Sequence, residues 1–386
     1  MIIDADTHFF PPDVYDYMGE EWEALRPQLV WDDNGLLTDV RFPGAPPVVP
    51  GSTPLPPPGT GARYRGCYYI EERLRDYEKL GVDKQVLFPQ LTSTLFSYLV
   101  EPRLAGAMAH SWNIAIGKLV AQEPERLIGA ALVALQDVGG AIREMEWAAK
   151  NGFSAVILDK VYPVHSHCYS EPYGVHRELW PFFARAEALQ MPLLMHSIAH
   201  GHRITNLMNF QYHGLDALAP QEGQMSLVSL ITSGLLDDFP GLNFVYTEAG
   251  VSFIKPLVEH LDTVHRDEFV DYDAEDSAPR FNYRKLTGGK RLVAAEDYRP
   301  KNKQAPSHYF KTNLHFTIET EEPELAEAID TFGASRFLFA TDYPHDDPGG
   351  RMKFRDAELM RAHQGISEAD KALINCGNAQ RLLRTG

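Results

Sequence analysis

Residues 3–8 read IDADTH, and residues 337–345 read FLFATDYPH. Each stretch is a short apolar run that ends in residue types able to bind metal ions. Side chains two residues apart in a strand point to the same face, so Asp6 and His8 can aim at one point. Asp342 ends the second stretch in the same way. The pattern predicts a metal site assembled at the C-terminal ends of parallel barrel strands.

Apolar runs of the same kind recur along the chain, and amphipathic stretches lie between them. Strands that alternate with helical patterns favour parallel β/α units. Eight runs favour a closed (β/α)8 barrel over an open doubly wound sheet, and no G-x-G-x-x-G motif follows any of them. We therefore expect an α/β distorted TIM barrel in a single domain of residues 1–386. The predicted strands are 1–6, 81–88, 127–135, 153–159, 192–196, 242–248, 312–317 and 337–342, and the predicted helices include 104–122, 138–151, 180–189 and 321–332.

Two stretches break this alternation, residues 34–66 and residues 267–306. The first is rich in Pro and Gly, so it can be neither a regular helix nor a central strand. The second is polar and follows the sixth predicted strand and its helix. Long loops in compact domains often form lids or binding loops, so we interpret both as insertions on the active face of the barrel. A surface excursion or a dimer contact explains each of them equally well.

Composition narrows the classes of function. The chain has 386 residues and a net charge of −17, with acidic residues spread along it, which argues against nucleic acid or an anionic membrane as partner. The three cysteines form no C-x-x-C pair, so a thiolate zinc site is not expected and a reduced cytoplasmic setting fits best. No signal-peptide pattern and no apolar run of the roughly 20 residues of a membrane span is seen. We expect a cytoplasmic protein with a small-molecule substrate.

Three further residues complete the candidate site. His196 ends the fifth predicted strand, and neutral imidazole suits zinc and iron. Glu248 ends the sixth and could bind metal or hold a water. His345 follows Asp342 by three residues and could contact the site from outside. The alternatives are a core histidine at 196, a salt bridge at 248, and a helix N-cap or turn residue at 342.

Other candidates lie on predicted loops near the strand ends. His200, Arg203 and Arg63 are interpreted as substrate contacts, although solvated loop side chains remain the alternative. Lys160 ends the fourth predicted strand, where some barrel metalloenzymes carry a modified lysine that bridges two metals. Aromatic residues in the loops suggest an apolar or ring-bearing substrate, although packing between the barrel and its helices accounts for most of them.

Together these residues resemble the amidohydrolase superfamily, in the branch that includes aminocarboxymuconate-semialdehyde decarboxylase and related hydrolases and decarboxylases. The resemblance covers nearly the whole chain. It implies a distorted TIM barrel with a divalent metal inside its C-terminal mouth, and it suggests a homodimer. Besides the strand-end residues it rests on 123–127 (EPERL), 239–242 (FPGL), 341–345 (TDYPH), 367–371 (SEADK) and 377–383 (GNAQRLL).

The resemblance also assigns roles. Asp6 and His8 stand where the family usually has His-x-His, His196 matches the fifth-strand ligand, and Asp342 matches the eighth-strand aspartate. An aspartate in place of the first histidine adds a hard oxygen ligand, which opens iron or manganese beside zinc, with one or two ions per chain. Glu248 stands where the decarboxylases of the branch have a catalytic histidine. An ionised glutamate only accepts hydrogen bonds, so this departure favours hydrolysis over decarboxylation.

The sequence leaves three functions open. The leading one is metal-dependent hydrolysis of an amide, ester, lactone or thioester, with Asp342 as general base and then acid and Glu248 in the metal shell or orienting the water. The second is non-oxidative decarboxylation, or a lyase step, on an aromatic or unsaturated acid. The third is a barrel without catalysis that serves as a binding or scaffold protein.

Overall fold

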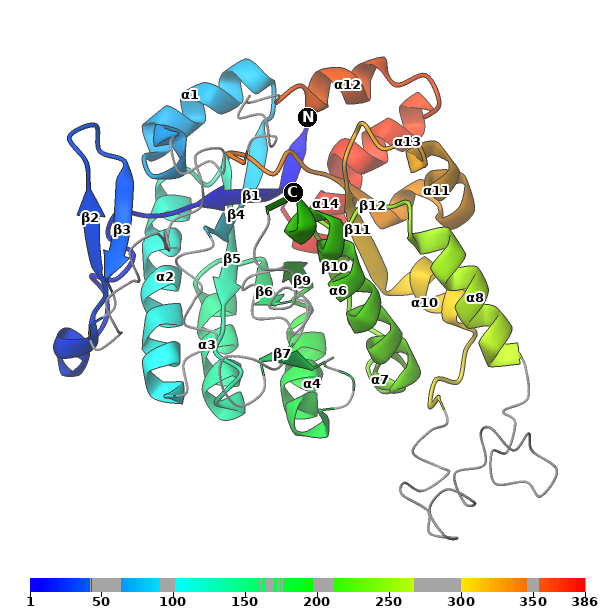
Figure 1. Cartoon of the computed structure of the whole chain (residues 1–386), viewed down its shortest axis with the longest axis horizontal. Coiled ribbons are helices and arrows are strands. Elements are labelled where there is room, and N and C mark those ends of the chain that lie inside the picture. Colours follow the sequence, from blue (N-terminus) through cyan, green and yellow to red (C-terminus); the bar gives the residue numbers. More distant parts are fainter. Residues whose placement is uncertain are drawn as a thin grey trace, which may run out of the picture.

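Eight strands run parallel to one another in the order in which they occur in the chain (Figure 1). The computed structural model describes residues 1–41, 43, 64–90, 101–159, 162–163, 170–171, 174, 176–196, 212–266, 300–345 and 354–385. The parallel ladder pairs neighbouring strands throughout, as β/α units require. The strands are β1 (Ile3–Phe9), β4 (Lys84–Pro89), β5 (Leu127–Leu132), β6 (Ala155–Asp159), β9 (Leu193–His196), β10 (Phe244–Tyr246), β11 (Leu314–Ile318) and β12 (Phe337–Phe339).

The first and last strands meet and nearly close the barrel. Thr7 and Tyr343 form an isolated parallel bridge, with the amide of His8 donating to the carbonyl oxygen of Tyr343 at 2.6 Å. The amide of Asp342 donates to the carbonyl oxygen of Asp6 at 3.1 Å. The predicted distorted TIM barrel is therefore confirmed, and its seam brings both ends of the sequence to one place.

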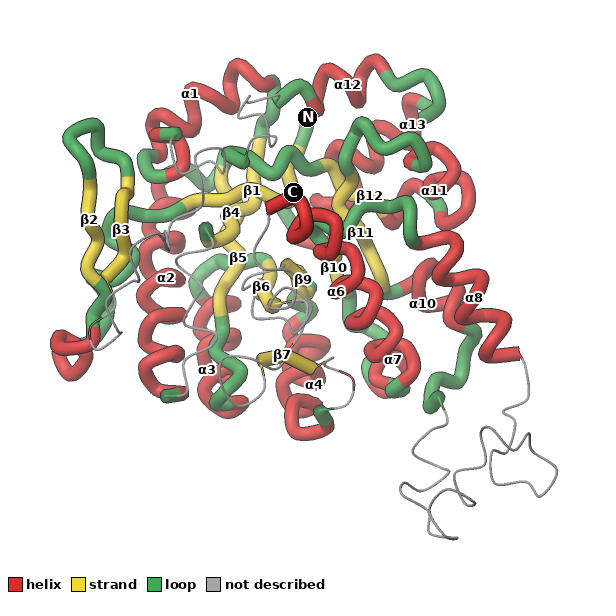
Figure 2. The backbone as a smooth tube through the Cα atoms, viewed as in Figure 1, coloured by secondary structure: helices red, strands yellow, loops and turns green. Residues whose placement is uncertain are grey.

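Helices surround the strands, as Figure 2 shows in red around the yellow barrel. α2 begins at a proline, and the side chain of Glu101 before it accepts a hydrogen bond from the amide of Arg103, which caps the helix. α1 ends at Gly81, whose φ of 69° is the left-handed conformation that glycine adopts at helix ends. The helices are α1 (Ile70–Leu80), α2 (Pro102–Gln122), α3 (Val138–Lys150), α4 (Trp180–Leu189), α6 (Tyr212–Thr232), α7 (Leu235–Asp238), α8 (Ile254–Arg266), α10 (Pro306–Thr312), α11 (Leu325–Phe332), α12 (Asp356–Ala362), α13 (Glu368–Ala372) and α14 (Asn378–Leu383).

A small antiparallel ribbon lies outside the barrel. β2 (Gln28–Trp31) pairs with β3 (Leu37–Arg41) and stands at one edge of the molecule in Figure 1. β3 falls at the start of the first predicted insertion, which agrees with the expectation that this stretch holds no central strand. A second short pair joins β7 (Tyr162–Pro163) to β8 (Ser170–Glu171).

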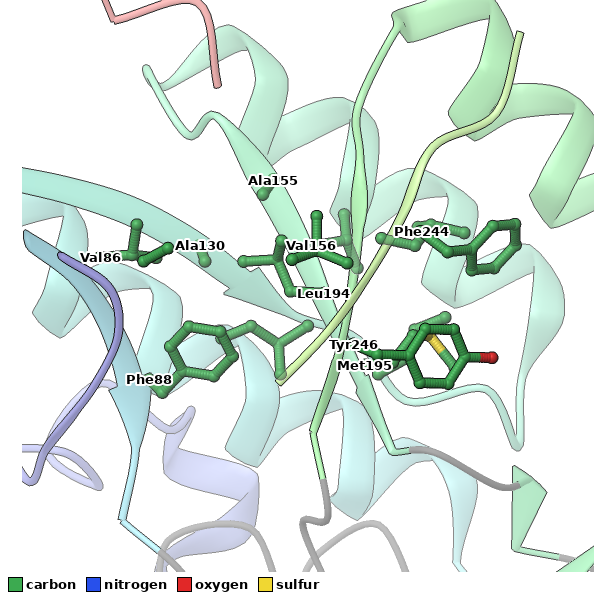
Figure 3. Packing of buried hydrophobic residues seen from close by; sticks show 14 of the residues in the cluster. Val86, Phe88, Ala130, Ala155, Val156, Leu194, Met195, Phe244 and Tyr246 are labelled. Atoms are coloured by element: carbon green, nitrogen blue, oxygen red, sulfur yellow. The ribbon is translucent and has the colours of Figure 1, made fainter. Parts of the chain in front are cut away.

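The core lies where the strands face one another and their helices. Figure 3 shows Val86, Ala130, Val156, Leu194 and Phe244 packed together from five successive strands. Burial of this apolar surface is the main favourable term for the fold. β1 is the exception, because it is entirely buried yet carries polar side chains, which the candidate site explains.

All eight predicted strands are present, with ends that shift by a few residues. The predicted helix at 321–332 starts later, at Leu325, because residues 319–322 form a turn in which the amide of Glu322 donates to the carbonyl oxygen of Glu319. Most of both predicted insertions, residues 44–63 and 267–299, lies outside the described residues. The single domain stays a prediction. None of the helices in the described part of the chain has the length and apolarity needed to cross a membrane.

Candidate active site

Five predicted site residues gather at the C-terminal ends of the barrel strands. Asp6 and His8 lie in β1, and His196 is the last residue of β9. Glu248 follows β10 by two residues, and Asp342 follows β12 by three. Because parallel strands end at the same rim, these side chains converge although the sequence separates them by up to 336 positions, from 6 to 342.

His8 is at the centre of this group. Its Nε2 lies 3.2 Å from Oδ1 of Asp342, 3.5 Å from Oε1 of Glu248 and 3.9 Å from Oδ1 of Asp6. Its Nδ1 lies 2.9 Å from the carbonyl oxygen of Pro89, which can only accept a hydrogen bond, so Nδ1 carries a proton. In the neutral ring this leaves the lone pair on Nε2, directed at the three carboxylates, as a metal ligand requires.

His196 completes the group from the opposite side. Its Nε2 lies 3.3 Å from Oε1 of Glu248 and 3.9 Å from Oδ1 of Asp6. The ring meets that of His8 edge to face, with centroids 4.7 Å apart. Ligand atoms of Asp6, His8 and His196 all lie within 4.8 Å of one another, and so do those of His8, Glu248, Asp342 and His345. The two sets share His8, so one cation between them reaches both.

His345 forms a second unit with Asp342. Nδ1 of His345 lies 2.7 Å from Oδ1 of Asp342, and Nε2 lies 2.8 Å from Oε1 of Gln90. The ring stacks on His8 with centroids 4.2 Å apart. An amide oxygen accepts only, so Gln90 places a proton on Nε2 and leaves Nδ1 to share a proton with the carboxylate. Gln90 was missed from the sequence, although it follows β4 directly and so occupies a strand-end position.

The backbone at two of the carboxylates is unusual. Glu248 has a φ of 45° and Asp342 a φ of 55°, both in the left-handed region that residues other than glycine seldom adopt. Such conformations cost about 1–3 kcal/mol each and persist where the surrounding structure imposes them, often at functional sites. Both carboxylates lie close to imidazole nitrogens of the group, Asp342 at 3.2 Å from His8 and Glu248 at 3.3 Å from His196.

Burial and neighbouring charges shift the pKa values of the group. Burial, and then the charge of Glu248, raises the pKa of Asp6 well above its usual range. Burial raises the pKa of Glu248, but His196 and the other imidazoles outweigh it, so the net pKa is well below its usual range. Burial lowers the pKa of His8, yet Asp342 and Glu248 raise it more. These shifts favour a protonated His8 beside an ionised Glu248, and a cation that binds here would displace that proton.

The donor set fits a divalent metal ion. Oδ1 of Asp6 and Nε2 of His8 are buried and make no hydrogen bond with any described residue, which is a costly state for polar atoms. A cation that both atoms ligate would remove that cost. Two imidazoles with several carboxylates suit zinc, manganese or iron and exclude a purely thiolate site.

A buried network holds β1 in place. The guanidinium of Arg73 donates to the carbonyl oxygen of His8 at 2.6 Å, to Oγ1 of Thr7 at 2.5 Å and to the side chain of Gln85. Across the seam, Asp4 accepts from the amide and hydroxyl of Thr341, at 3.0 and 2.6 Å. These bonds fix the strand ends that carry Asp6, His8 and Asp342. Arg73 was missed from the sequence because a single arginine in a helix is ordinarily exposed.

The structure does not test the remaining predicted site residues. Lys160, His200, Arg203 and Arg63 lie outside the described residues, so their predicted roles stay predictions. The nearby Arg65 is described: its Nε lies 3.6 Å from Glu72, and it sits over the ring of Tyr69.

Comparison with known proteins gives one family. The family model described as amidohydrolase matches residues 3–385. A gamma-resorcylate decarboxylase from Polaromonas sp. (strain JS666) is 25% identical over 320 residues, which cover 81% of this chain and 87% of the relative.

Solved structures share the fold. A 2,6-dihydroxybenzoate decarboxylase from Rhizobium has a TM-score of 0.67 at 20% identity, covering 99% of this chain and 98% of that one. A 5-carboxyvanillate decarboxylase from Novosphingobium aromaticivorans DSM 12444, complexed with manganese and 4-hydroxy-3-methoxy-5-nitrobenzoic acid, has a TM-score of 0.69 at 19% identity. The alignment covers 100% of this chain and 96% of that one.

The expectation of hydrolysis was wrong. The matched relatives are decarboxylases, which favours the alternative that the sequence left open. The argument for hydrolysis was that an ionised Glu248 cannot donate a hydrogen bond. In the structure Oε1 of Glu248 faces His8 and His196, and the pair that can hold a proton is Asp342 with His345. The glutamate therefore does not remove the proton donor that decarboxylation needs.

Proposed function

This chain belongs to the amidohydrolase family, and from that premise we propose that it is a metal-dependent, non-oxidative decarboxylase of a hydroxybenzoic acid. The observation that carries the proposal is the Asp342–His345 pair, which can hold a proton, beside a group of buried metal-ligand atoms. The similarity to decarboxylases of 2,6-dihydroxybenzoate and 5-carboxyvanillate supports the substrate class.

We assign Asp6, His8, His196 and Asp342 as metal ligands, with Glu248 beside them as a further ligand or as the acceptor that orients His196. Manganese is the first choice, because relatives are known with it and because carboxylate oxygens suit it. Zinc and iron are the alternatives. When bound, the cation would attract the substrate carboxylate and a neighbouring ring oxygen and draw off negative charge.

The reaction replaces a carboxylate by a proton. The bond between the ring carbon and the carboxylate breaks, carbon dioxide leaves, and the ring carbon gains one proton. In our proposal Asp342 delivers that proton as general acid, a role worth typically 10²–10⁴-fold in rate. Asp342 is partly exposed at the mouth, and Nδ1 of His345 lies 2.7 Å from its Oδ1, so the imidazole can return a proton to it after each turnover.

His345 is suited to supply protons to Asp342. Burial lowers its pKa, but Asp342 raises it more, and the net pKa lies above the usual value. Gln90 fixes the far nitrogen, so proton exchange is confined to the side that faces Asp342. Contact of the substrate with His200, Arg203 and Arg63, and a homodimer, are kept as predictions from the sequence.

The test is product analysis on protein reconstituted with Mn²⁺. We expect 2,6-dihydroxybenzoate or 5-carboxyvanillate to yield one equivalent of carbon dioxide and the corresponding phenol, measured by chromatography and by trapped carbon dioxide. Benzoate, which has no ring hydroxyl, is the control substrate and should not react. Protein that holds metal and releases no carbon dioxide from any hydroxybenzoic acid tested would contradict the proposal.

A further inference from the structure

A cavity lies at the end of the barrel opposite the candidate metal site. It has a volume of about 340 Å³ and is lined by residues that precede or begin β9, β10, β11 and β12, together with α14. His196, Glu248 and Asp342 lie at or beyond the C-terminal ends of β9, β10 and β12, so the two places lie at opposite ends of these three strands. The lining includes three arginines, Arg336, Arg381 and Arg384.

Backbone carbonyl groups hold these arginines in position. Arg336 donates from Nη1 to the carbonyl oxygen of Thr312 at 2.8 Å, and Arg381 donates from Nη2 to that of Ser335 at 3.1 Å. Arg384 donates from Nη2 to the carbonyl oxygen of residue 189 at 3.3 Å. A guanidinium has five N–H donors, so each arginine keeps several after these bonds.

None of the three has an ion pair with a carboxylate among the described residues. Other described arginines, such as Arg185 and Arg355, do pair with glutamates. The amide of Gly241, another lining residue, donates to Oε1 of Glu187 at 2.6 Å. Three positive charges therefore line one cavity, and none of them forms an ion pair with a carboxylate in the part of the chain that the structure describes.

A buried histidine lies in the same lining. His315 is 1% exposed, and its Nε2 lies 3.1 Å from Oδ1 of Asn243. Its Nδ1 is buried and has no hydrogen-bond partner within the part of the chain that the structure describes. Burial, and then the charges of Arg336 and Arg381, lower the pKa of His315 well below its usual range. Burial first, and then the two guanidinium groups, therefore favour the neutral form of the ring.

We propose that this cavity binds a small multivalent oxyanion, of the phosphate or polycarboxylate class. Planar guanidinium groups match the oxygens of such anions with two parallel hydrogen bonds, and several arginines around one pocket are suited to more than one negative charge. The volume accommodates a small organic anion. The site is independent of the proposed reaction, because none of its residues takes part in the metal centre.

The competing explanation is structural. Residues at the N-terminal face of a TIM barrel commonly serve stability, and the three arginines could simply tie α14 and the loops to the strand ends. A purely structural role predicts only the general stabilisation that phosphate gives any folded protein, without saturation and without dependence on the arginines. The two explanations therefore differ in one measurable property, which is the effect of phosphate on the folded protein.

The experiment measures thermal unfolding and calorimetric binding with inorganic phosphate, at constant ionic strength kept with sodium chloride. We expect the midpoint of unfolding to rise with phosphate concentration, because a ligand that binds the native state stabilises it. Arg381→Gln and Arg384→Gln should each weaken phosphate binding at least tenfold. Arg381→Lys should retain part of it. Arg355→Gln is the matched control, since Arg355 is exposed and paired with Glu358.

Malonate and citrate form a second arm, which separates a carboxylate ligand from a phosphate ligand. A saturable response to either anion that Arg381→Gln weakens and Arg355→Gln does not supports the proposal, and the stronger anion identifies the source. Equal responses to phosphate and chloride, or equal responses of the wild type and Arg381→Gln, would overturn it. Arg381 is exposed, and its variant should fold, so both results can be read.

Discussion

The two ends of the barrel are built from the same strands and carry opposite charges. At the C-terminal ends, Asp6, Glu248 and Asp342 crowd around imidazoles at 3.2–3.9 Å. At the N-terminal ends, Arg336 and its two neighbouring arginines line a cavity and bond to backbone carbonyl oxygens. One end is arranged for a cation, and the other for an anion.

The comparison shows that one fold can place its reactive side chains at one end of the strands and side chains with other roles at the opposite end. The side chains at the mouth face one another, and Oδ1 of Asp6 and Nε2 of His8 are buried there without a hydrogen-bond partner among the described residues. The arginines at the other end line one cavity, and each donates to a backbone carbonyl oxygen. Changes at the mouth should therefore alter metal binding and rate, whereas changes elsewhere should alter stability or a response to ligands.

The largest effect is expected from removing both β1 ligands. The double variant Asp6→Ala, His8→Ala should lose bound metal, with affinity reduced by more than about 100-fold, because even residues that only orient ligands cost 10–100-fold. Elemental analysis of purified protein measures it, with circular dichroism as the check on folding. Asp330→Asn, on the exposed face of α11, is the control and should keep its metal. Metal retained by the double variant would place the centre elsewhere.

The next effect tests the proton donor. Asp342→Asn keeps an oxygen ligand and tolerates the left-handed backbone, since asparagine adopts it readily. We expect kcat for decarboxylation to fall about 10²–10⁴-fold while the metal stays bound. Steady-state kinetics together with metal analysis of the same sample measure it. A rate within a factor of about three of wild type, which is below the effect of a lost general acid, would remove Asp342 from the mechanism.

A smaller effect tests the support beneath the site. Arg73→Met leaves the carbonyl oxygen of His8 and the side chain of Gln85 buried without their donor, so the free energy of unfolding should fall by about 2–4 kcal/mol. Urea denaturation measures it. Arg75→Met is the matched control on the same helix, because Arg75 is exposed, and it should change stability by less than about 0.5 kcal/mol. Equal effects of the two variants would show that Arg73 is not the anchor of β1.

The smallest effect uses a histidine–carboxylate pair outside the barrel. Nδ1 of His110 lies 3.0 Å from Glu144, and this hydrogen bond raises the pKa of His110 although burial lowers it. A raised pKa adds stability that is fully present below the unfolded value of about 6.5 and is lost as pH rises through the folded value.

Glu144→Gln should therefore cost more at pH 5.5 than at pH 8.5. The difference should be below about 1 kcal/mol, because His110 is 38% exposed and solvent screens the pair. Denaturation at both pH values measures it, and His110→Gln should abolish the dependence. A cost of Glu144→Gln that is the same at both pH values would assign its role to the bond with Asn113 alone.

The barrel and most of the candidate site could be predicted because both follow from strand geometry. Apolar runs between amphipathic stretches gave the eight strands, and the side chain at each strand end must face the mouth. His196, Glu248 and Asp342 therefore needed only the position of each strand end. Gln90 obeys the same rule, but the second strand was predicted to end at residue 88, so it was overlooked.

The rest depended on contacts between distant segments. Arg73 is buried because the seam between β1 and β12 closes over it, and nothing in its helix indicates that. The arginine cavity joins a loop before β12 to α14, and no periodicity links Arg336 with Arg381. The expected reaction was wrong because the choice between hydrolysis and decarboxylation rested on the type of one residue, Glu248. In the structure Glu248 faces two imidazoles, whereas Asp342 and His345 lie within hydrogen-bond distance of each other, and only the positions of the side chains reveal this.

The hydrogen bonds between Asp4 and Thr341 span 337 residues, and this separation has a consequence for biosynthesis. A ribosome adding roughly 5–20 residues per second makes Thr341 on the order of half a minute after Asp4. During that interval β1 already carries the acidic side chains that the folded protein buries. One of its edges stays unpaired, because the last strand has not yet been synthesised. The nascent chain must therefore keep β1 without its final partner strand until nearly all of the barrel has emerged from the ribosome. A permuted chain that joins β12 directly to β1 would shorten this wait, and its folding should depend less on chaperones.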